Sequence, residues 1–318
     1  MILAPTADVR SDGRPRRSDQ SGLAEVASSV RRGEPVRRVG VILRPVTDAP
    51  VRNIYFELTD AFNATEPTVA LSSGQAAVYY RVAIMSKDGD WIIRETREAC
   101  ATVLGELDVR GARYRSAAPL DTRWLAGGWS SHFEFFDARQ RRVRCDFVSR
   151  PPRVPRADVN ALFVGPDKPP SLNVVGLVAL IALKQTQRAK DYSVIGELAT
   201  QLPPEREIET TTDPDRILAL APMFGHASSR SAVSAARVAH VDRRAVVVAL
   251  AEEIDTMQQA DKRRVAAYEA AAQPYLEACR AQRVSTFDLR EAHARMLEIA
   301  ERLLPRSVEP GFSHADAQ

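Results

Sequence analysis

The sequence predicts an α+β protein in which a small mixed β-sheet with flanking helices is followed by a helical C-terminal domain. In the first half, runs rich in β-branched and aromatic residues alternate with segments of helical periodicity. The proline-punctuated stretch "RPPRVPR" near residue 150 then indicates a linker. Beyond it, Ala-rich and Arg/Glu-rich segments with helical character continue to about Leu304.

Composition narrows the class of protein. A chain of 318 residues is long enough for two domains, and 45% hydrophobic with 27% charged residues excludes global disorder. The net charge of +3 is too small to indicate a nucleic-acid binder by itself. The longest apolar stretch, "LNVVGLVALIAL", is too short to span a bilayer, which predicts no membrane partner. Three widely separated cysteines exclude a disulfide framework and favour a reducing, cytoplasmic location.

The chain divides into four predicted regions. Residues 1–35 are rich in Arg, Ser, Pro and Asp without hydrophobic periodicity, which is typical of a flexible arm. We expect the α/β domain over residues 36–165 and the helical domain over residues 166–305. Residues 306–318 are predicted to be a flexible tail.

The first elements follow from spacing. Ile54, Leu58 and Phe62 recur at helical spacing, and Pro67 ends that helix. Next, "TVALSSGQAAVYY" predicts a strand, a break at residues 72–74 and an Ala-rich helix. Residues 82–93 are predicted to be a strand by their β-branched and aromatic content.

The later elements carry clearer end signals. Residues 94–112 predict a helix with Gly111 at its C-cap. Residues 132–148 predict a β-hairpin around the polar tip 137–140. We expect residues 172–199 to be helical, and Ser285 with Asp288 three residues later suggests a capping box for the final helix.

The stretch "SKDGDWII" carries the first candidate chemistry. If it is a strand, Asp88 and Asp90 project from one face, roughly 6.5 to 7 Å apart along it. Two such carboxylates repel unless a cation lies between them, and oxygen ligands suit Mg²⁺ or Mn²⁺. The alternative is a surface hairpin turn at Asp88-Gly89.

A third acid lies in the predicted hairpin. In "RRVRCDFV" the apolar residues share one strand face, and Asp146 lies on the other. It is either a ligand or part of the solvated face of an edge strand. Three acids together could bind two cations, as in phosphoryl-transfer sites.

Two further segments could bind phosphate. Small residues at 72–74, in a strand-to-helix turn, allow backbone amides to approach a phosphate. Lys184, Arg188 and Asp191 fall at i, i+4 and i+7, on one helix face. They form either a solvated stripe or a site whose two cations hold a triphosphate.

The order of these pieces resembles a known family. "ALSSGQAAVYYRVAIMSKDGDWII", then "VRCDFV", then "LVALIALKQTQRAKDYSVIGEL" is similar to the nucleotidyltransferase superfamily with the polymerase-β-like fold. The similarity covers about residues 50 to 200 and is closest to the branch with AbiEii-type toxins of toxin–antitoxin and abortive-infection systems. In that branch a small-residue turn precedes an Asp-x-Asp strand, a third Asp lies on a later strand, and a helix carries Lys, Arg and an acid.

The resemblance implies a role for each matching residue. The implied metal ligands for Mg²⁺ or Mn²⁺ are Asp88, Asp90 and Asp146. The nucleotide would contact the small and basic residues Ser72, Ser73, Gly74, Ser86, Lys184 and Arg188. Lys184 and Asp191 would join the three acids as catalytic residues.

The resemblance implies an enzyme that moves a nucleotide from a nucleoside triphosphate to a hydroxyl or phosphate acceptor, on an RNA or a protein. It further implies a toxin with an antitoxin partner. Three departures favour an alternative, a catalytically lapsed module that binds or regulates. They are Ser-Ser-Gly in place of Gly-Gly or Gly-Ser, Ile84 in place of a basic residue, and Gly89 in place of an apolar β-former.

Overall fold

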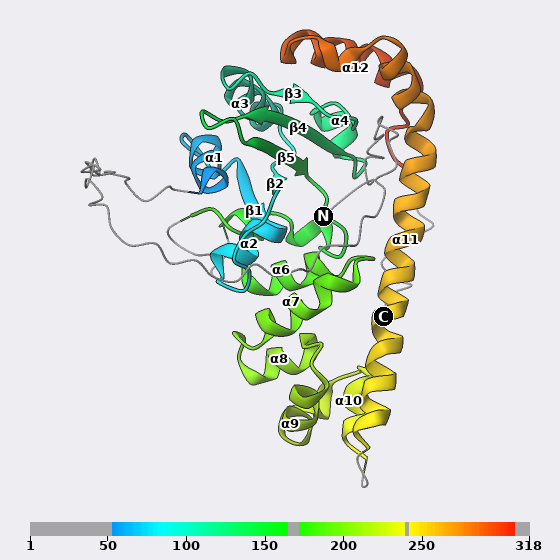
Figure 1. The fold of residues 1–318 in the computed structure, drawn as a ribbon. Coiled ribbons are helices and arrows are strands. Elements are labelled where there is room, and N and C mark those ends of the chain that lie inside the picture. The colour runs from blue at the N-terminus through cyan, green and yellow to red at the C-terminus, as the bar shows by residue number, and fades with distance from the viewer. Residues whose placement is uncertain (1–52, 165–171, 239–241, 309–318) are drawn as a thin grey trace, which may run out of the picture. The chain divides into compact units, whose positions relative to one another are not determined.

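The computed structural model describes residues 53–164, 172–238 and 242–308 (Figure 1). The predicted N-terminal arm and most of the predicted C-terminal tail lie outside these residues. Within them, no helix is long and apolar enough to cross a bilayer.

A five-stranded mixed sheet forms the centre of the first half, in the order β1-β2-β5-β4-β3. Strand β2 pairs parallel with β5, and the other neighbouring strands pair antiparallel. The α+β class and the mixed sheet are therefore confirmed. The strands are β1 (Val69–Ser72), β2 (Gly89–Ile93), β3 (Arg113–Tyr114), β4 (Ser130–Phe136) and β5 (Arg142–Val148).

Two helices of the first half begin at side-chain caps, and a glycine follows the end of one of them. Asn53 caps the first helix by accepting the Tyr55 N–H, and Thr96 caps the third by accepting the Ala99 N–H. Gly111 follows the third helix with a φ of 65°, as its predicted place at the helix end requires. The α-helices are α1 (Ile54–Phe62), α2 (Ser73–Tyr79), α3 (Arg97–Val109), α4 (Thr122–Leu125) and α5 (Ala161–Val164), with a 3₁₀ turn at Arg156–Asp158.

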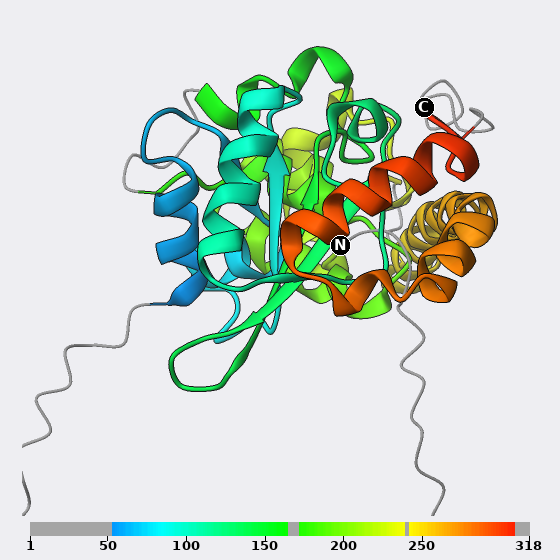
Figure 2. The ribbon, with the colours of Figure 1, turned by 90° about the horizontal axis from the view of Figure 1, so that it is seen from above.

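One face of the sheet is packed with aromatic side chains. The ring of Trp91 stacks on Phe147 at a centroid distance of 5.3 Å, and Phe62 of α1 meets both rings edge-on. Helices α1 and α3 lie together on this side of the strands (Figure 2). Because strand side chains alternate, residues 90 and 146 must point to the opposite face.

The second half is helical, as predicted. A large hydrophobic core includes residues from both sides of residue 165, and a smaller core lies within α8 to α11. The helices are α6 (Leu177–Lys184), α7 (Ala189–Ala199), α8 (Pro204–Thr210), α9 (Pro214–Phe224), α10 (Ser231–Ala236), α11 (Arg243–Ala281) and α12 (Leu289–Leu303), with 3₁₀ turns at Gly225–Ala227 and Val284–Thr286.

The predicted strand over residues 82–93 is wrong in its first half. Only Gly89–Ile93 forms a strand, and the preceding residues are irregular. The cause lies in β1, whose last residue, Ser72, is the Cα partner of Asp90. From Ser73 onward the chain turns into α2, so no strand remains on that side to pair with residues before 89.

The predicted helix over residues 172–199 is interrupted. Residues 173 and 175 instead bond to the backbone of Leu71 on β1, and residues 185–188 separate α6 from α7. At the last helix, Asp288 is itself the N-cap and accepts the Glu291 N–H. The predicted capping box from Ser285 is therefore displaced by three residues.

Gly89 provides a test of the packing beneath β2. A Cβ at this position would overlap the rings of Trp91 and Tyr55, so Gly89→Ala should lower the free energy of unfolding by about 1–3 kcal/mol. The measurement is urea denaturation followed by circular dichroism. The matched control is Gly105→Ala in α3, where an added Cβ meets nothing within 4 Å. It should stabilise by about 0.5–1 kcal/mol, and equal effects of the two changes would contradict this packing.

Candidate functional site

Four polar residues form a row across four strands of the sheet. Ser72 is the Cα partner of Asp90, Asp90 of Asp146, and Asp146 of His132. Direct partners on neighbouring strands point to the same face, so the carboxylates of Asp90 and Asp146 lie side by side. Since β5 is an interior strand, the edge-strand interpretation of Asp146 is wrong.

The two neighbouring carboxylates disturb each other. Burial, followed by the charge of Asp90, raises the pKa of Asp146 to about 7. Arg115 opposes this shift, with Nη1 at 3.2 Å from Asp146 Oδ1. Two neighbouring carboxylates repel unless a proton or a positive charge lies close to them, so the row has the chemistry to hold a cation.

Asp88 lies at the end of a fixed loop just before β2. The Tyr55 hydroxyl donates to the Lys87 carbonyl at 2.5 Å, and Gln75 Nε2 donates to the Ser86 carbonyl at 2.9 Å. Asp88 Oδ1 is inaccessible to solvent and makes no hydrogen bond within the described residues, although Arg144 Nη1 faces it at 3.6 Å. Gly89, the next residue, is buried in β2, so the hairpin-turn interpretation of this stretch is wrong.

Two of the three predicted metal ligands lie side by side, and the third is paired with an arginine. Asp90 and Asp146 are direct neighbours, whereas Asp88 is paired with Arg144, its neighbour on β5. Across the described residues, no group of three or more His, Cys, Asp or Glu side chains is arranged to hold a metal ion. Carboxylate oxygens are the donors that Mg²⁺ and Mn²⁺ prefer, so the Asp90–Asp146 pair and the unbonded oxygen of Asp88 fit such an ion chemically.

The small-residue turn lies beside Asp90. Ser72 Oγ donates to the Asp90 carbonyl at 3.1 Å, and Ser73 has a φ of 52°, unusual for a residue with a side chain. Burial works to raise the pKa of Asp90, and a hydrogen bond from Ser73 is among the contacts that work to lower it. A Cβ on Gly74 would overlap Ser86 Oγ, so this glycine is needed for the close approach of the two segments.

The basic residues converge through a turn between two helices. Asp191 accepts hydrogen bonds from Thr186 Oγ1 at 2.8 Å and Arg188 Nε at 3.0 Å, and Lys184 Nζ faces its other oxygen at 3.5 Å. Lys184 and Asp191 are only 5% and 4% exposed, so the solvated-stripe interpretation is wrong for both. Burial lowers the pKa of Lys184, and the carboxylates of Asp191 and Asp90 oppose this.

Several residues around the site were missed by sequence reasoning. For His132 the signal fell one residue short, because a tip at 137–140 would pair residue 132 with residue 145, whereas the structure pairs Phe136 with Arg142 and so His132 with Asp146. The others come from loops and helices whose position no pattern reveals. The missed residues are Gln75, Arg115, His132, Arg144, Thr186 and Asp261.

Two solved structures resemble the chain weakly. One is a candidate nucleotidyltransferase from H. pylori and the other is JHP933 from Helicobacter pylori, each with 12% sequence identity and a TM-score of 0.35. The two matches cover 66% and 68% of this chain, respectively, and each covers 94% of the matched chain. No protein-family model matches the chain, and no curated protein matches its sequence.

His132 makes stability depend on pH. Burial, followed by the charge of Arg115, lowers the pKa of His132 from 6.5 to about 3, so the folded protein holds the imidazole neutral. Between these values the unfolded chain binds the extra proton. Stability should therefore fall with decreasing pH by up to about 1.4 kcal/mol per pH unit from this residue.

The check is denaturation at several pH values for the wild type and His132→Asn. The variant should show a shallower decrease below pH 6.5. An imidazole NMR signal of His132 that titrates near pH 6.5 in the folded protein would contradict the prediction.

Proposed function

We propose that the chain is a metal-dependent nucleotidyltransferase that moves a nucleotide from a nucleoside triphosphate to a hydroxyl or phosphate acceptor. The observation that carries the proposal is the pairing of Asp90 with Asp146 on one sheet face, with Lys184 and Arg188 acting electrostatically on that same row. A metal–triphosphate complex needs both kinds of group, anionic ligands for the cation and cations for the phosphates.

Each group has a distinct task in this proposal. Asp90 and Asp146 would hold Mg²⁺ or Mn²⁺, with Asp88 as a third ligand. Such a cation supplies Lewis-acid stabilisation of charge on the reacting phosphate. Asp146 would also accept the proton of an acceptor hydroxyl as its oxygen bonds to the α-phosphorus and the bond to pyrophosphate breaks.

The nucleotide would be held by its phosphates. Lys184 lies at the end of α6 and Arg188 just before α7, and both are oriented by Asp191. The turn at residues 72–74 would contribute backbone and hydroxyl donors from the other side. The acceptor, an RNA or a protein, and a toxin role with an antitoxin partner extend the proposal through the family resemblance.

A second candidate is a catalytically lapsed module that binds or regulates through the same fold. It is favoured by the ion pair of Arg144 with Asp88, because a paired carboxylate is a weaker metal ligand. A thermal-shift screen separates the two. An intact site should be stabilised by Mn²⁺ or Mg²⁺ together with a nucleoside triphosphate, and a lapsed one should not.

The first prediction of the proposal concerns the carboxylate row. Asp90→Asn or Asp146→Asn should reduce metal-dependent nucleotide transfer by at least about a hundredfold, because the cation loses an anionic ligand. The measurement is incorporation of label from each α-³²P-nucleoside triphosphate into total RNA and protein. The exposed Asp158→Asn serves as the control and should behave as the wild type. A fully active Asp90→Asn would exclude the proposed role of the pair.

The second prediction concerns the binding of the triphosphate. Arg188→Gln should raise the Kd for a Mg²⁺–nucleoside triphosphate about tenfold, the usual cost of losing one charge-assisted hydrogen bond. Isothermal titration calorimetry provides the Kd. Lys190→Gln is the matched control, since Lys190 is exposed and lies only two residues further along. Equal losses in both variants would show that only general positive charge matters.

A further inference from the structure

Helix α11 reaches the turn that separates Lys184 from Arg188. We propose that Asp261 of α11 is a positioning residue that sets the spacing of these two cations for nucleotide binding. This inference rests on the function proposed above for the same site. It concerns a residue that touches neither the proposed metal ligands nor the phosphates.

The contact of Asp261 with the turn is direct and buried. Its Oδ2 accepts the Gln187 N–H at 2.9 Å, and its Oδ1 accepts from Arg264 Nη2 at 2.8 Å. Asp261 is only 5% exposed. A buried carboxylate that accepts a backbone N–H makes a strong bond, so it fixes the residue immediately before Arg188.

The turn depends on other side chains as well. Arg153 Nε donates to the Gln185 carbonyl at 2.7 Å, while its Nη2 donates to the Met257 carbonyl of α11 at 2.9 Å. The Tyr192 hydroxyl donates to the Thr186 carbonyl at 3.0 Å. Each of the three residues between Lys184 and Arg188 therefore has a backbone group bonded by a side chain from outside the turn.

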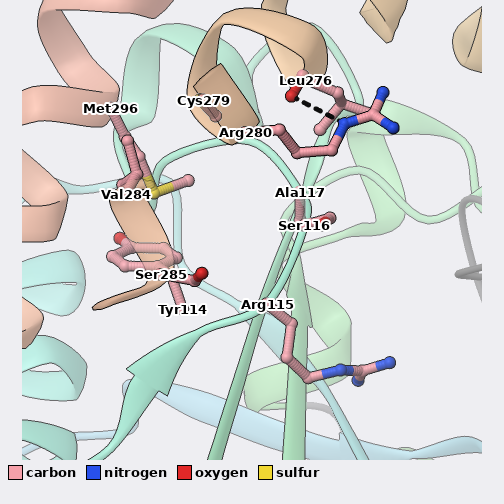
Figure 3. A pocket seen from close by; sticks show the side chains of 10 residues that line it. All are labelled: Tyr114, Arg115, Ser116, Ala117, Leu276, Cys279, Arg280, Val284, Ser285 and Met296. Carbon is pink, nitrogen blue, oxygen red and sulfur yellow. Dashed lines mark hydrogen bonds between the residues drawn. The ribbon is translucent and has the colours of Figure 1, made fainter. Parts of the chain in front are cut away.

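The same helix also fixes the loop that carries Arg115. The Tyr275 hydroxyl donates to the Ala117 carbonyl at 3.1 Å, two residues beyond Arg115. Figure 3 shows the Arg115 side chain pointing away from Leu276 and the rest of the cavity lining. The cavity itself, of about 50 Å³, has room for water and not for a nucleotide. Helix α11 thus bonds to the backbone of two segments that carry cations, the loop with Arg115 and the turn between Lys184 and Arg188. Asp261 makes the contact with the turn.

The variant Asp261→Asn tests the role of the charge. The amide keeps the size of the side chain and loses its charge, so the turn should be held less firmly. We expect the Kd for a Mg²⁺–nucleoside triphosphate to rise about fivefold to tenfold, measured by calorimetry well below the melting temperature. The matched control is Glu253→Gln on the same helix, whose carboxylate binds Arg230 and the Ala232 N–H away from the turn.

A double-mutant cycle separates positioning from general destabilisation. If Asp261 acts by placing Arg188, the substitution Arg188→Gln should weaken nucleotide binding less in the Asp261→Asn background than in the wild type. Fully additive losses would overturn the inference. Should Asp261→Asn not fold, Asp261→Glu is the second variant, because it keeps the charge and displaces the carboxylate from the Gln187 N–H by one methylene. An unchanged Kd in that variant would overturn the inference.

The outcomes distinguish the two levels of the proposal. A wild-type protein that binds none of the four ribonucleoside triphosphates with Mg²⁺ or Mn²⁺ removes the proposed function. A wild-type protein that binds one of them, with unchanged affinity in Asp261→Asn, leaves the function standing and overturns the positioning role.

Discussion

The parallel pairing of β2 with β5 is the constraint on which the rest of the site depends. It is the one parallel pair of strands in the described part of the chain, and its register places Asp90 beside Asp146. A slip of one residue would turn Asp146 toward the aromatic face, because side chains alternate. The stacked rings of Trp91 and Phe147, which belong to the next step of the ladder, resist such a slip from the other side of the sheet. The polar site is therefore held by an apolar interaction.

The acids and bases of the site are mutually dependent. Carboxylates placed side by side repel, and buried cations without partners are equally unfavourable. In the structure each of these acids faces a cationic side chain. Arg115 pairs with Asp146, Arg144 pairs with Asp88, and Lys184 and Arg188 both pair with Asp191. Within the site, the charges of these acids and bases therefore offset one another.

Much of the fold follows from local signals in the sequence, and much of the site does not. The hairpin, the strand-to-helix turn and α3 could be predicted because hydrophobic periodicity and helix caps depend on residues close together in the sequence. The irregular loop before Asp88 and the break after Lys184 could not be predicted from neighbouring residues. The loop lies beside a strand that ends early, and the turn is bonded to a carboxylate more than seventy residues away, at Asp261. Residues of the right chemical type could be predicted for the site, whereas the loops and pairings that orient them could not.

The separation of Gln187 from Asp261 by 74 residues has a consequence for the newly made chain. During synthesis the sheet and its carboxylates leave the ribosome first, while α11 is still being made. Contacts between distant parts of a chain form late, since the closure entropy must be overcome before they contribute. A nascent or truncated chain would therefore display the acidic row before the backbone of its basic turn is held in place. Assembly of the site would thus be delayed until the long helix α11 has been made.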